Sequence, residues 1–198
     1  MTDDKLELLR SVDKSWTLFL DRDGVINDEK HMDYVNTWEE FSFYKGAVEA
    51  ISILSQRFGL IFVITNQRGI ARGRTKLEDL EIIHKNMMAE ISKAGGRIDK
   101  VYFCADIESS SPYRKPNPGM GQAAKKEFPQ VDFSKSIMIG NTITDMEFGR
   151  NLNTGINIFL PTTIPLIKVQ NPIVDLVFPD LLSVANAIEK NHKPANWQ

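Results

Sequence analysis

The sequence has a single cysteine, Cys104, so an internal disulfide is excluded. It has no uninterrupted apolar run long enough to span a membrane and does not begin like a signal segment. Lysine and arginine are not clustered, and the net charge of −2 leaves no electrostatic footprint for nucleic acid or an anionic membrane. These absences predict a cytoplasmic protein that binds neither nucleic acid nor membranes.

The composition is that of a soluble globular protein, with 42% hydrophobic and 25% charged residues in 198. This length suits one domain with a sizeable core, and the sequence shows no internal repeat. We expect a single domain over 16–190, a peripheral N-terminal extension over 1–15 and a C-terminal tail over 191–198. A monomer is expected.

Short apolar runs alternate with segments of helical period, which is typical of a parallel sheet covered by helices. Strands are predicted at 17–20, 60–65, 100–104, 136–139, 156–160 and, more weakly, 173–178. Helices are predicted over 47–56, along a stripe from Leu77 to Ile91, after Asn117, and from Pro179-Asp180 to about Glu189. Thr75 with Glu78 predicts a capping box, and Asn117 with Pro118 predicts an N-cap and a first-turn proline.

Two carboxylates follow the first predicted strand, in the order Asp21-Arg22-Asp23-Gly24. Ligands of parallel α/β sheets bind at the carboxyl ends of the strands, so both aspartates lie where a substrate is expected. One can attack phosphorus while the other handles a proton. A simple turn also favours Asp and Gly, but a calcium loop is excluded because Val25 and Ile26 occupy its fifth and sixth positions.

Further polar groups follow the other strands. Thr65, Asn66 and Gln67 can donate to phosphate oxygens, although they could equally just cap the end of the strand. Lys115 suits a charge opposite phosphate, although most lysines are solvated surface residues. Asp145 opens a helix after Gly140, where it can help to hold a cation or simply favour the helix dipole. The functional interpretation depends on the whole set.

Together these motifs resemble the haloacid dehalogenase superfamily of phosphohydrolases. The words Asp21 to Asn27, Tyr34-Val35, Thr65 to Gly73 and Arg114 to Met120 are most similar to the D-glycero-D-manno-heptose-1,7-bisphosphate phosphatases and the related histidinol-phosphatases. The similarity spans about 16–160. It implies an α/β, Rossmann-like three-layer fold with a central parallel sheet and no cap domain.

The resemblance also implies site roles. Asp21 would be the nucleophile and Asp23 the general acid and base, and Thr65, Asn66 and Lys115 would bind the phosphoryl group. Arg114, Gln67 and Tyr34 would contact the rest of a small phosphorylated substrate. The implied cofactor is Mg²⁺, with Asp21, Asp23, Asn141 and Asp145 as its expected ligands.

The chain departs from these relatives in two places. Asn141 stands where they usually have aspartate, so we expect weaker magnesium binding and expect Asn141→Asp to strengthen it. The loop over 105–114 contains neither Cys nor His, so no structural zinc is expected there. Among the histidines, His84 is expected to be structural or solvated, and His31 is a candidate substrate contact.

Four functions are therefore compared. The favoured substrate is D-glycero-D-manno-heptose 1,7-bisphosphate, and histidinol phosphate is the nearest alternative. A polynucleotide 3′-phosphatase is disfavoured because no basic groove is indicated. A catalytically weakened protein that binds a phosphorylated ligand is the alternative of another class, motivated by Asn141.

Overall fold

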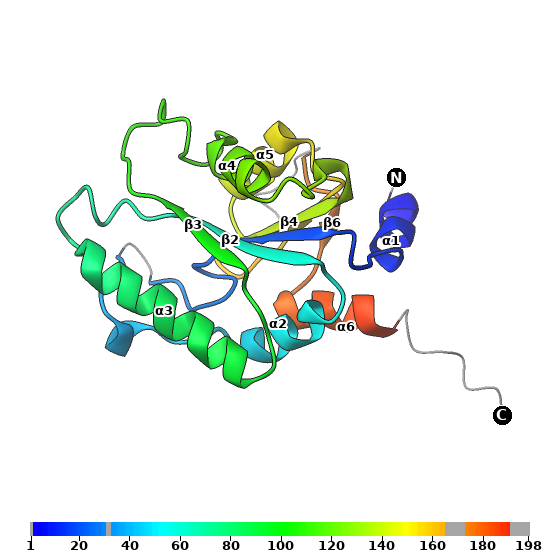
Figure 1. The fold of residues 1–198 in the computed structure, drawn as a ribbon, viewed down its shortest axis with the longest axis horizontal. Helices are drawn as coiled ribbons and strands as arrows, with labels where there is room; N and C mark the ends of the chain where they lie inside the picture. Colours follow the sequence, from blue (N-terminus) through cyan, green and yellow to red (C-terminus); the bar gives the residue numbers. More distant parts are fainter. Residues whose placement is uncertain (1, 31–32, 165–172, 191–198) are drawn as a thin grey trace.

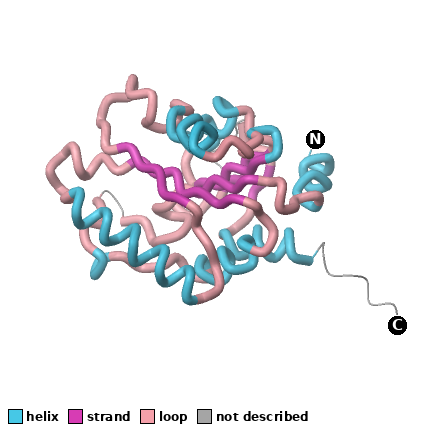
Figure 2. Tube along the Cα trace, viewed as in Figure 1, coloured by secondary structure: helices cyan, strands magenta, loops and turns pink. Residues whose placement is uncertain are grey.

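The computed structural model describes residues 2–30, 33–164 and 173–190, and His31, His192 and the predicted tail over 191–198 lie outside that description. Six parallel strands form one sheet in the order β3-β2-β1-β4-β5-β6. Helices lie on both of its faces (Figures 1 and 2), with α2, α3 and α6 on one side and α4 and α5 on the other. The predicted Rossmann-like α/β fold is confirmed.

The strands are β1 (Thr17–Leu20), β2 (Leu60–Asn66), β3 (Lys100–Cys104), β4 (Ser136–Gly140), β5 (Ile156–Phe159) and β6 (Leu176–Val177). All six lie within or one residue beyond the predicted ranges. The last is shorter than predicted, since only two of the six residues pair with β5.

The helices are α1 (Thr2–Arg10), α2 (Ala47–Ser55), α3 (Leu77–Lys93), α4 (Gly119–Glu127), α5 (Ile143–Leu152) and α6 (Leu181–Lys190). Short 3-10 helices span Trp38–Glu40 and Phe133–Lys135. Helix α1 lies in the segment expected to be peripheral, yet Leu9 is buried against the core. The segment before β1 is therefore attached to the domain through its apolar face.

The central strand shows how the sequence builds two cores. All four residues of β1 are buried, because a strand in the middle of a covered sheet has no solvent-facing side. Leu18 and Leu20 pack on the side of α2, α3 and α6, whereas Phe19 packs with Phe62 on the side of α4 and α5. Each such buried side chain stabilises the fold by about 1.5–3 kcal/mol.

Two predicted helix caps are wrong. Lys76 is the N-cap of α3, and the Thr75 hydroxyl donates instead to Asn36 Oδ1 at 2.7 Å. Pro118 is the N-cap of α4, while Asn117 Nδ2 donates to the carbonyls of Ser109 and Ser111. In both cases the polar side chain joins two loops near the rim of the sheet, which a local sequence pattern does not reveal.

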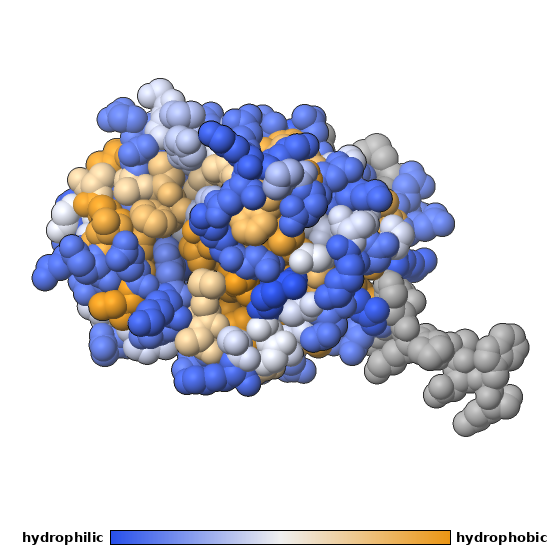
Figure 3. Space-filling model, viewed as in Figure 1, coloured by the Kyte–Doolittle hydropathy of each residue, from blue (hydrophilic) through white to orange (hydrophobic). Residues whose placement is uncertain are grey.

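Apolar and polar residues are interspersed on the face shown in Figure 3. Within the described residues, no helix is long and apolar enough to cross a membrane. The loops after β1 and β3 project at the carboxyl ends of the strands, and no second domain covers that rim in the described part of the chain.

Candidate active site

A cavity of about 330 Å³ opens at the carboxyl ends of the central strands. Nine of the ten predicted site residues line it: Asp21, Asp23, Tyr34, Thr65, Asn66, Gln67, Arg114, Lys115 and Asp145. The tenth, Asn141, is fully buried and contacts Glu29, which also lines the cavity. Four separate stretches of sequence therefore converge at one edge of the sheet.

Lys115 forms the centre of the buried charges. Its Nζ donates to Asp21 Oδ1 at 2.8 Å, to Asp145 Oδ1 at 2.6 Å and to the Ile64 carbonyl at 2.8 Å. Burial alone would lower the pKa of Lys115, but the charges of Asp145 and Asp21 raise it above its usual value. The ammonium is therefore a fixed positive charge beside Asp21.

Asp21 is 7% exposed and lies directly after β1. Burial and then the charge of Asp145 raise its pKa to about 7, against the opposing charge of Lys115. A nucleophilic carboxylate has to be ionised, so this residue needs a further positive charge during catalysis. The backbone N–H of Asp21 donates to the Ile139 carbonyl at 3.0 Å, which places the ends of β1 and β4 side by side.

Asp23 is held by three donors. Its Oδ1 accepts from Arg22 Nη2 at 2.9 Å and from Asn27 Nδ2 at 3.0 Å, and its Oδ2 accepts from Gln67 Nε2 at 2.8 Å. Burial raises the pKa of Asp23, but the Arg22 charge and these hydrogen bonds outweigh burial and lower it. The carboxylate is thus kept ionised and oriented.

The amides after β2 serve the other site residues. Gln67 Nε2 also donates to Thr65 Oγ1 at 2.7 Å, so the Thr65 hydroxyl hydrogen is left for another acceptor. Asn66 Nδ2 donates to the Lys115 carbonyl at 3.1 Å, and Asn66 Oδ1 accepts from the Lys115 N–H at 3.0 Å. In this structure Asn66 fixes the backbone of Lys115, and Gln67 orients Asp23.

The fourth motif divides its two residues between different tasks. Asp145 Oδ2 accepts from the backbone of Asn141 and Thr142 and from the Thr142 hydroxyl, forming the capping box of α5. Its Oδ1 accepts from Lys115, so both carboxylate oxygens of Asp145 have donors. The Asn141 Oδ1, by contrast, is buried without a hydrogen-bond partner in the described residues.

Gly24 is required where the chain leaves the aspartates. Its φ of 80° lies in the left-handed region, and a Cβ there would meet Asn141 Nδ2 at 2.0 Å. The first and fourth motifs are therefore in direct contact.

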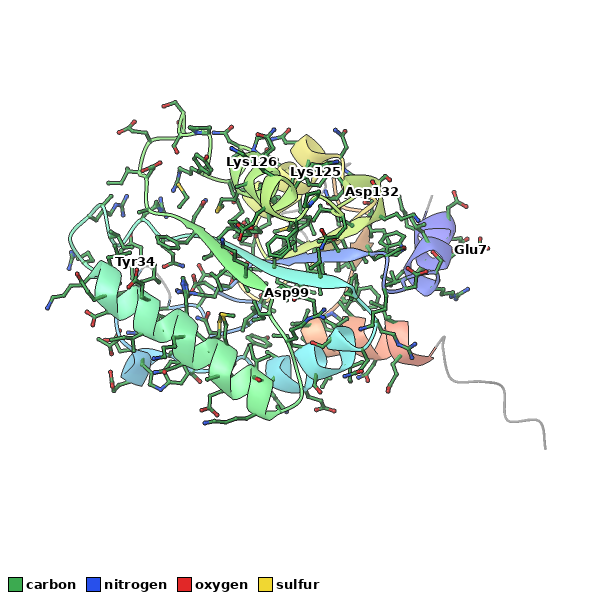
Figure 4. The ribbon with its side chains drawn as sticks, in the orientation of Figure 1. Glu7, Tyr34, Asp99, Lys125, Lys126 and Asp132 are labelled. Carbon is green, nitrogen blue, oxygen red and sulfur yellow. The ribbon has the colours of Figure 1, made fainter. Side chains whose placement is uncertain are left out.

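Positive groups gather on the outer part of the cavity. Arg68 and Arg114 line it, and Arg72 Nη1 donates to the Tyr34 hydroxyl at 2.8 Å. Tyr34 lies near the first turn of α3 (Figure 4). Burial and then the charges of Arg68 and Arg72 lower the pKa of Arg114, which shows that the three guanidinium groups repel one another. Such an arrangement is stabilised by an anion.

Three residues of this site were not predicted from the sequence. Arg22 stands between the aspartates yet is only 1% exposed, and Glu29 and Thr163 meet Asn141 from two different loops. No local pattern marks them, because each acts through a partner distant in sequence.

Comparison with known proteins defines the class first. Residues 4–153 match the family of haloacid dehalogenase-like hydrolases, and the chain belongs to that family. It is an enzyme, a phosphatase of this family.

Particular relatives narrow the comparison. A Campylobacter jejuni protein named D-glycero-alpha-D-manno-heptose-1,7-bisphosphate 7-phosphatase is 42% identical over 142 residues, 72% of this chain and 80% of the relative. The Escherichia coli K12 D-glycero-beta-D-manno-heptose-1,7-bisphosphate 7-phosphatase is 30% identical over 186 residues, 90% of this chain and 96% of the relative.

Solved structures agree. The D,D-heptose 1.7-bisphosphate phosphatase of B. bronchiseptica, complexed with magnesium and phosphate, superposes with a TM-score of 0.81. It is 26% identical and the match covers 88% of this chain and 98% of that one. The resemblance predicted from the motifs is confirmed.

Proposed function

We propose that this phosphatase removes the 7-phosphate of D-glycero-D-manno-heptose 1,7-bisphosphate, with Mg²⁺ as cofactor and Asp21 as nucleophile. The observation that carries this proposal is the pairing of a buried Asp21 and Lys115 with a second, arginine-rich region at the cavity rim. A substrate with two phosphates suits both regions at once.

The reaction proceeds in two halves. A carboxylate oxygen of Asp21 attacks phosphorus, the bond from phosphorus to the sugar oxygen breaks, and Asp23 gives that oxygen a proton. Asp23 then takes a proton from water, whose oxygen attacks the aspartyl-phosphate and releases inorganic phosphate and Asp21. Lys115 and the Thr65 hydroxyl offset the negative charge on the phosphoryl oxygens.

The residues present fit a magnesium ion. Asp21, the main-chain carbonyl of Asp23 and the unpartnered Oδ1 of Asn141 are hard oxygen ligands, few enough to leave room for water and phosphate. When bound, the ion neutralises charge on the phosphoryl group and favours the ionised form of Asp21. Asp145 is less available as a ligand, because Lys115 and the capping box use both of its oxygens.

The rim distinguishes between substrates. Arg68, Arg72 and Arg114 attract the 1-phosphate of the sugar, whereas histidinol phosphate carries an amine that these guanidinium groups repel. Tyr34 and Arg72, which are hydrogen-bonded to each other, can contact sugar hydroxyls or this second phosphate. The bisphosphate is therefore favoured over histidinol phosphate.

The test measures phosphate release from both anomers of the heptose bisphosphate, from histidinol phosphate and from p-nitrophenyl phosphate, with Mg²⁺ and with EDTA. We expect the highest kcat/KM on a heptose bisphosphate, loss of activity in EDTA, and no turnover by Asp21→Asn. Preference for histidinol phosphate would overturn the substrate assignment, and inactivity on all substrates would favour a weakened phospho-ligand-binding protein.

A further inference from the structure

The side chain of Asn141 is oriented by two acceptors. Its Nδ2 donates to Thr163 Oγ1 at 2.7 Å and to Glu29 Oε2 at 3.3 Å, which uses both hydrogens of the amide. Thr163 in turn donates to the same Glu29 oxygen at 2.5 Å. Glu29, Thr163 and Asn141 thus form a closed triangle that joins the loop after β1, the segment after β5 and the end of β4.

This triangle determines which way the amide faces. Turning the amide over would place Oδ1 against the Glu29 carboxylate, so that two acceptors would meet without a hydrogen between them. The observed orientation avoids that repulsion and leaves Oδ1 without a hydrogen-bond partner in the described residues, although Asn141 is 0% exposed. A buried acceptor left unpaired costs about 1–3 kcal/mol, and a cation is its natural complement.

Glu29 also brings a negative charge to the same place. It lines the cavity together with Asp21 and Asp23, and its carboxylate lies beside the amide that stands in place of a carboxylate. Its backbone belongs to the exposed loop after β1, so the ion would be reached through Asn141 rather than by Glu29 replacing it.

We propose that Glu29 and Thr163 hold Asn141 with its Oδ1 toward a divalent cation, and that Glu29 supplies the negative charge that an amide at position 141 lacks. This inference rests on the magnesium site of the proposed function. Glu29 acts as a positioning residue through Asn141, in the manner of groups that orient metal ligands from outside the ion's own ligand set.

The contact changes the expected effect of restoring an aspartate at position 141. Asn141→Asp alone replaces Nδ2 by a carboxylate oxygen directly opposite Glu29, where two like charges repel. The single variant therefore gains little or no affinity for the cation. Glu29→Gln combined with Asn141→Asp keeps the wild-type charge, removes the repulsion and should recover tight binding.

The experiment measures Mn²⁺ binding to the full chain by electron paramagnetic resonance, without substrate, for the wild type, both single variants and the double variant. Glu29→Gln should raise the Kd about three- to tenfold, at or below the lower end of the effects seen for groups that orient metal ligands because Glu29 is exposed. Asn141→Asp should not lower the Kd by more than about twofold, whereas the double variant should bind at least as tightly as the wild type.

Asp28→Asn is the matched control, because it removes the same charge from the neighbouring exposed residue, which does not line the cavity. It should change the Kd less than about twofold. Thr163→Val should weaken binding in the same direction as Glu29→Gln. Thermal unfolding in EDTA verifies that each variant folds.

Equal effects of Glu29→Gln and Asp28→Asn would overturn the inference. Purely additive effects of the two changes at positions 29 and 141 would do so as well. Because no substrate is present, a wrong sugar assignment leaves these measurements unaffected, so failure of the substrate proposal and failure of this one are distinguishable.

Discussion

The Nε2 atom of His84 lies 3.1 Å from Nη1 of Arg22, a guanidinium that is almost completely buried beside the two aspartates. A guanidinium can only donate, so Nε2 must accept and the ring is neutral. Burial and then the Arg22 charge lower the pKa of His84 to about 3, in agreement with a neutral ring. Through Nη2, the same guanidinium holds Asp23.

We therefore predict that His84→Leu misplaces Asp23 as a proton donor. Release of a sugar alkoxide needs that proton, whereas release of p-nitrophenolate does not. His84→Leu should lower kcat on the heptose bisphosphate about ten- to a hundredfold, a range typical of small displacements of catalytic groups, and change p-nitrophenyl phosphate turnover far less. Steady-state kinetics on both substrates measure the difference.

His84→Gln is the matched control, since its amide oxygen can still accept from Arg22. It should recover most of the activity on the sugar phosphate. If the leucine variant loses the same factor on both substrates, the effect is general damage to the fold and not a displaced proton donor.

Lys115 is 3% exposed and separates two carboxylates that would otherwise face each other. Lys115→Met leaves Asp21 and Asp145 buried without their cation, and removing one partner of a buried pair costs about 3–5 kcal/mol. Urea unfolding at pH 7 should show a loss of that size together with loss of activity. Lys100→Met, which breaks an exposed pair with Glu127, should cost no more than about 1 kcal/mol.

The raised pKa of Asp21 predicts a dependence of stability on pH and magnesium. A carboxyl group whose folded-state pKa rises from 3.8 to about 7 favours the fold when protonated. Its contribution is complete below about pH 4 and is lost as the pH rises through about 7. In EDTA the chain should therefore have a lower free energy of unfolding at pH 8 than at pH 6, as far as this residue is concerned.

Magnesium should reverse that loss, because a divalent cation favours the ionised carboxylate. Urea unfolding should show a larger stabilisation by Mg²⁺ at pH 8 than at pH 6. The Asp21→Asn variant, which cannot titrate at this position, should show a smaller difference between the two pH values. The same difference in wild type and variant would rule out Asp21 as its source.

The sequence predicted the sheet because its strands are short apolar runs between amphipathic helices, and burial on both faces leaves such segments little alternative. It also predicted which residues meet at the rim, since the carboxyl ends of parallel strands share one edge. It did not predict what Asn66 and Gln67 contact. Their partners, the Lys115 backbone and the Asp23 carboxylate, lie 49 and 44 residues away.

Local patterns failed where loops contact each other. Thr75 and Asn117 have the residue types of helix caps, but their side chains bond to Asn36 and to the loop before α4 instead. His84 is similar, because its place on an amphipathic stripe indicates a core residue, whereas its role depends on Arg22 across the fold. Tertiary contacts outweigh local propensity at these positions.

The arginine groups at the cavity rim lead to the last prediction, which separates recognition of the second phosphate from the chemistry at the first. Arg114→Met removes one of three mutually repelling guanidinium groups near the outer part of the cavity, and Arg114 makes no contact with Asp21 or Lys115 in the described structure. The KM for heptose bisphosphate should rise about tenfold or more, because a charge-assisted contact to phosphate contributes about 1.5–3 kcal/mol. The kcat should change little, and the kcat/KM for a heptose 7-monophosphate, which lacks the 1-phosphate, should be almost unaffected. Arg74→Met, in the same loop as Arg72 but not lining the cavity, is the control and should leave both substrates unchanged. An equal rise in KM for the monophosphate would place Arg114 on the sugar or on the reacting phosphate rather than on the second one.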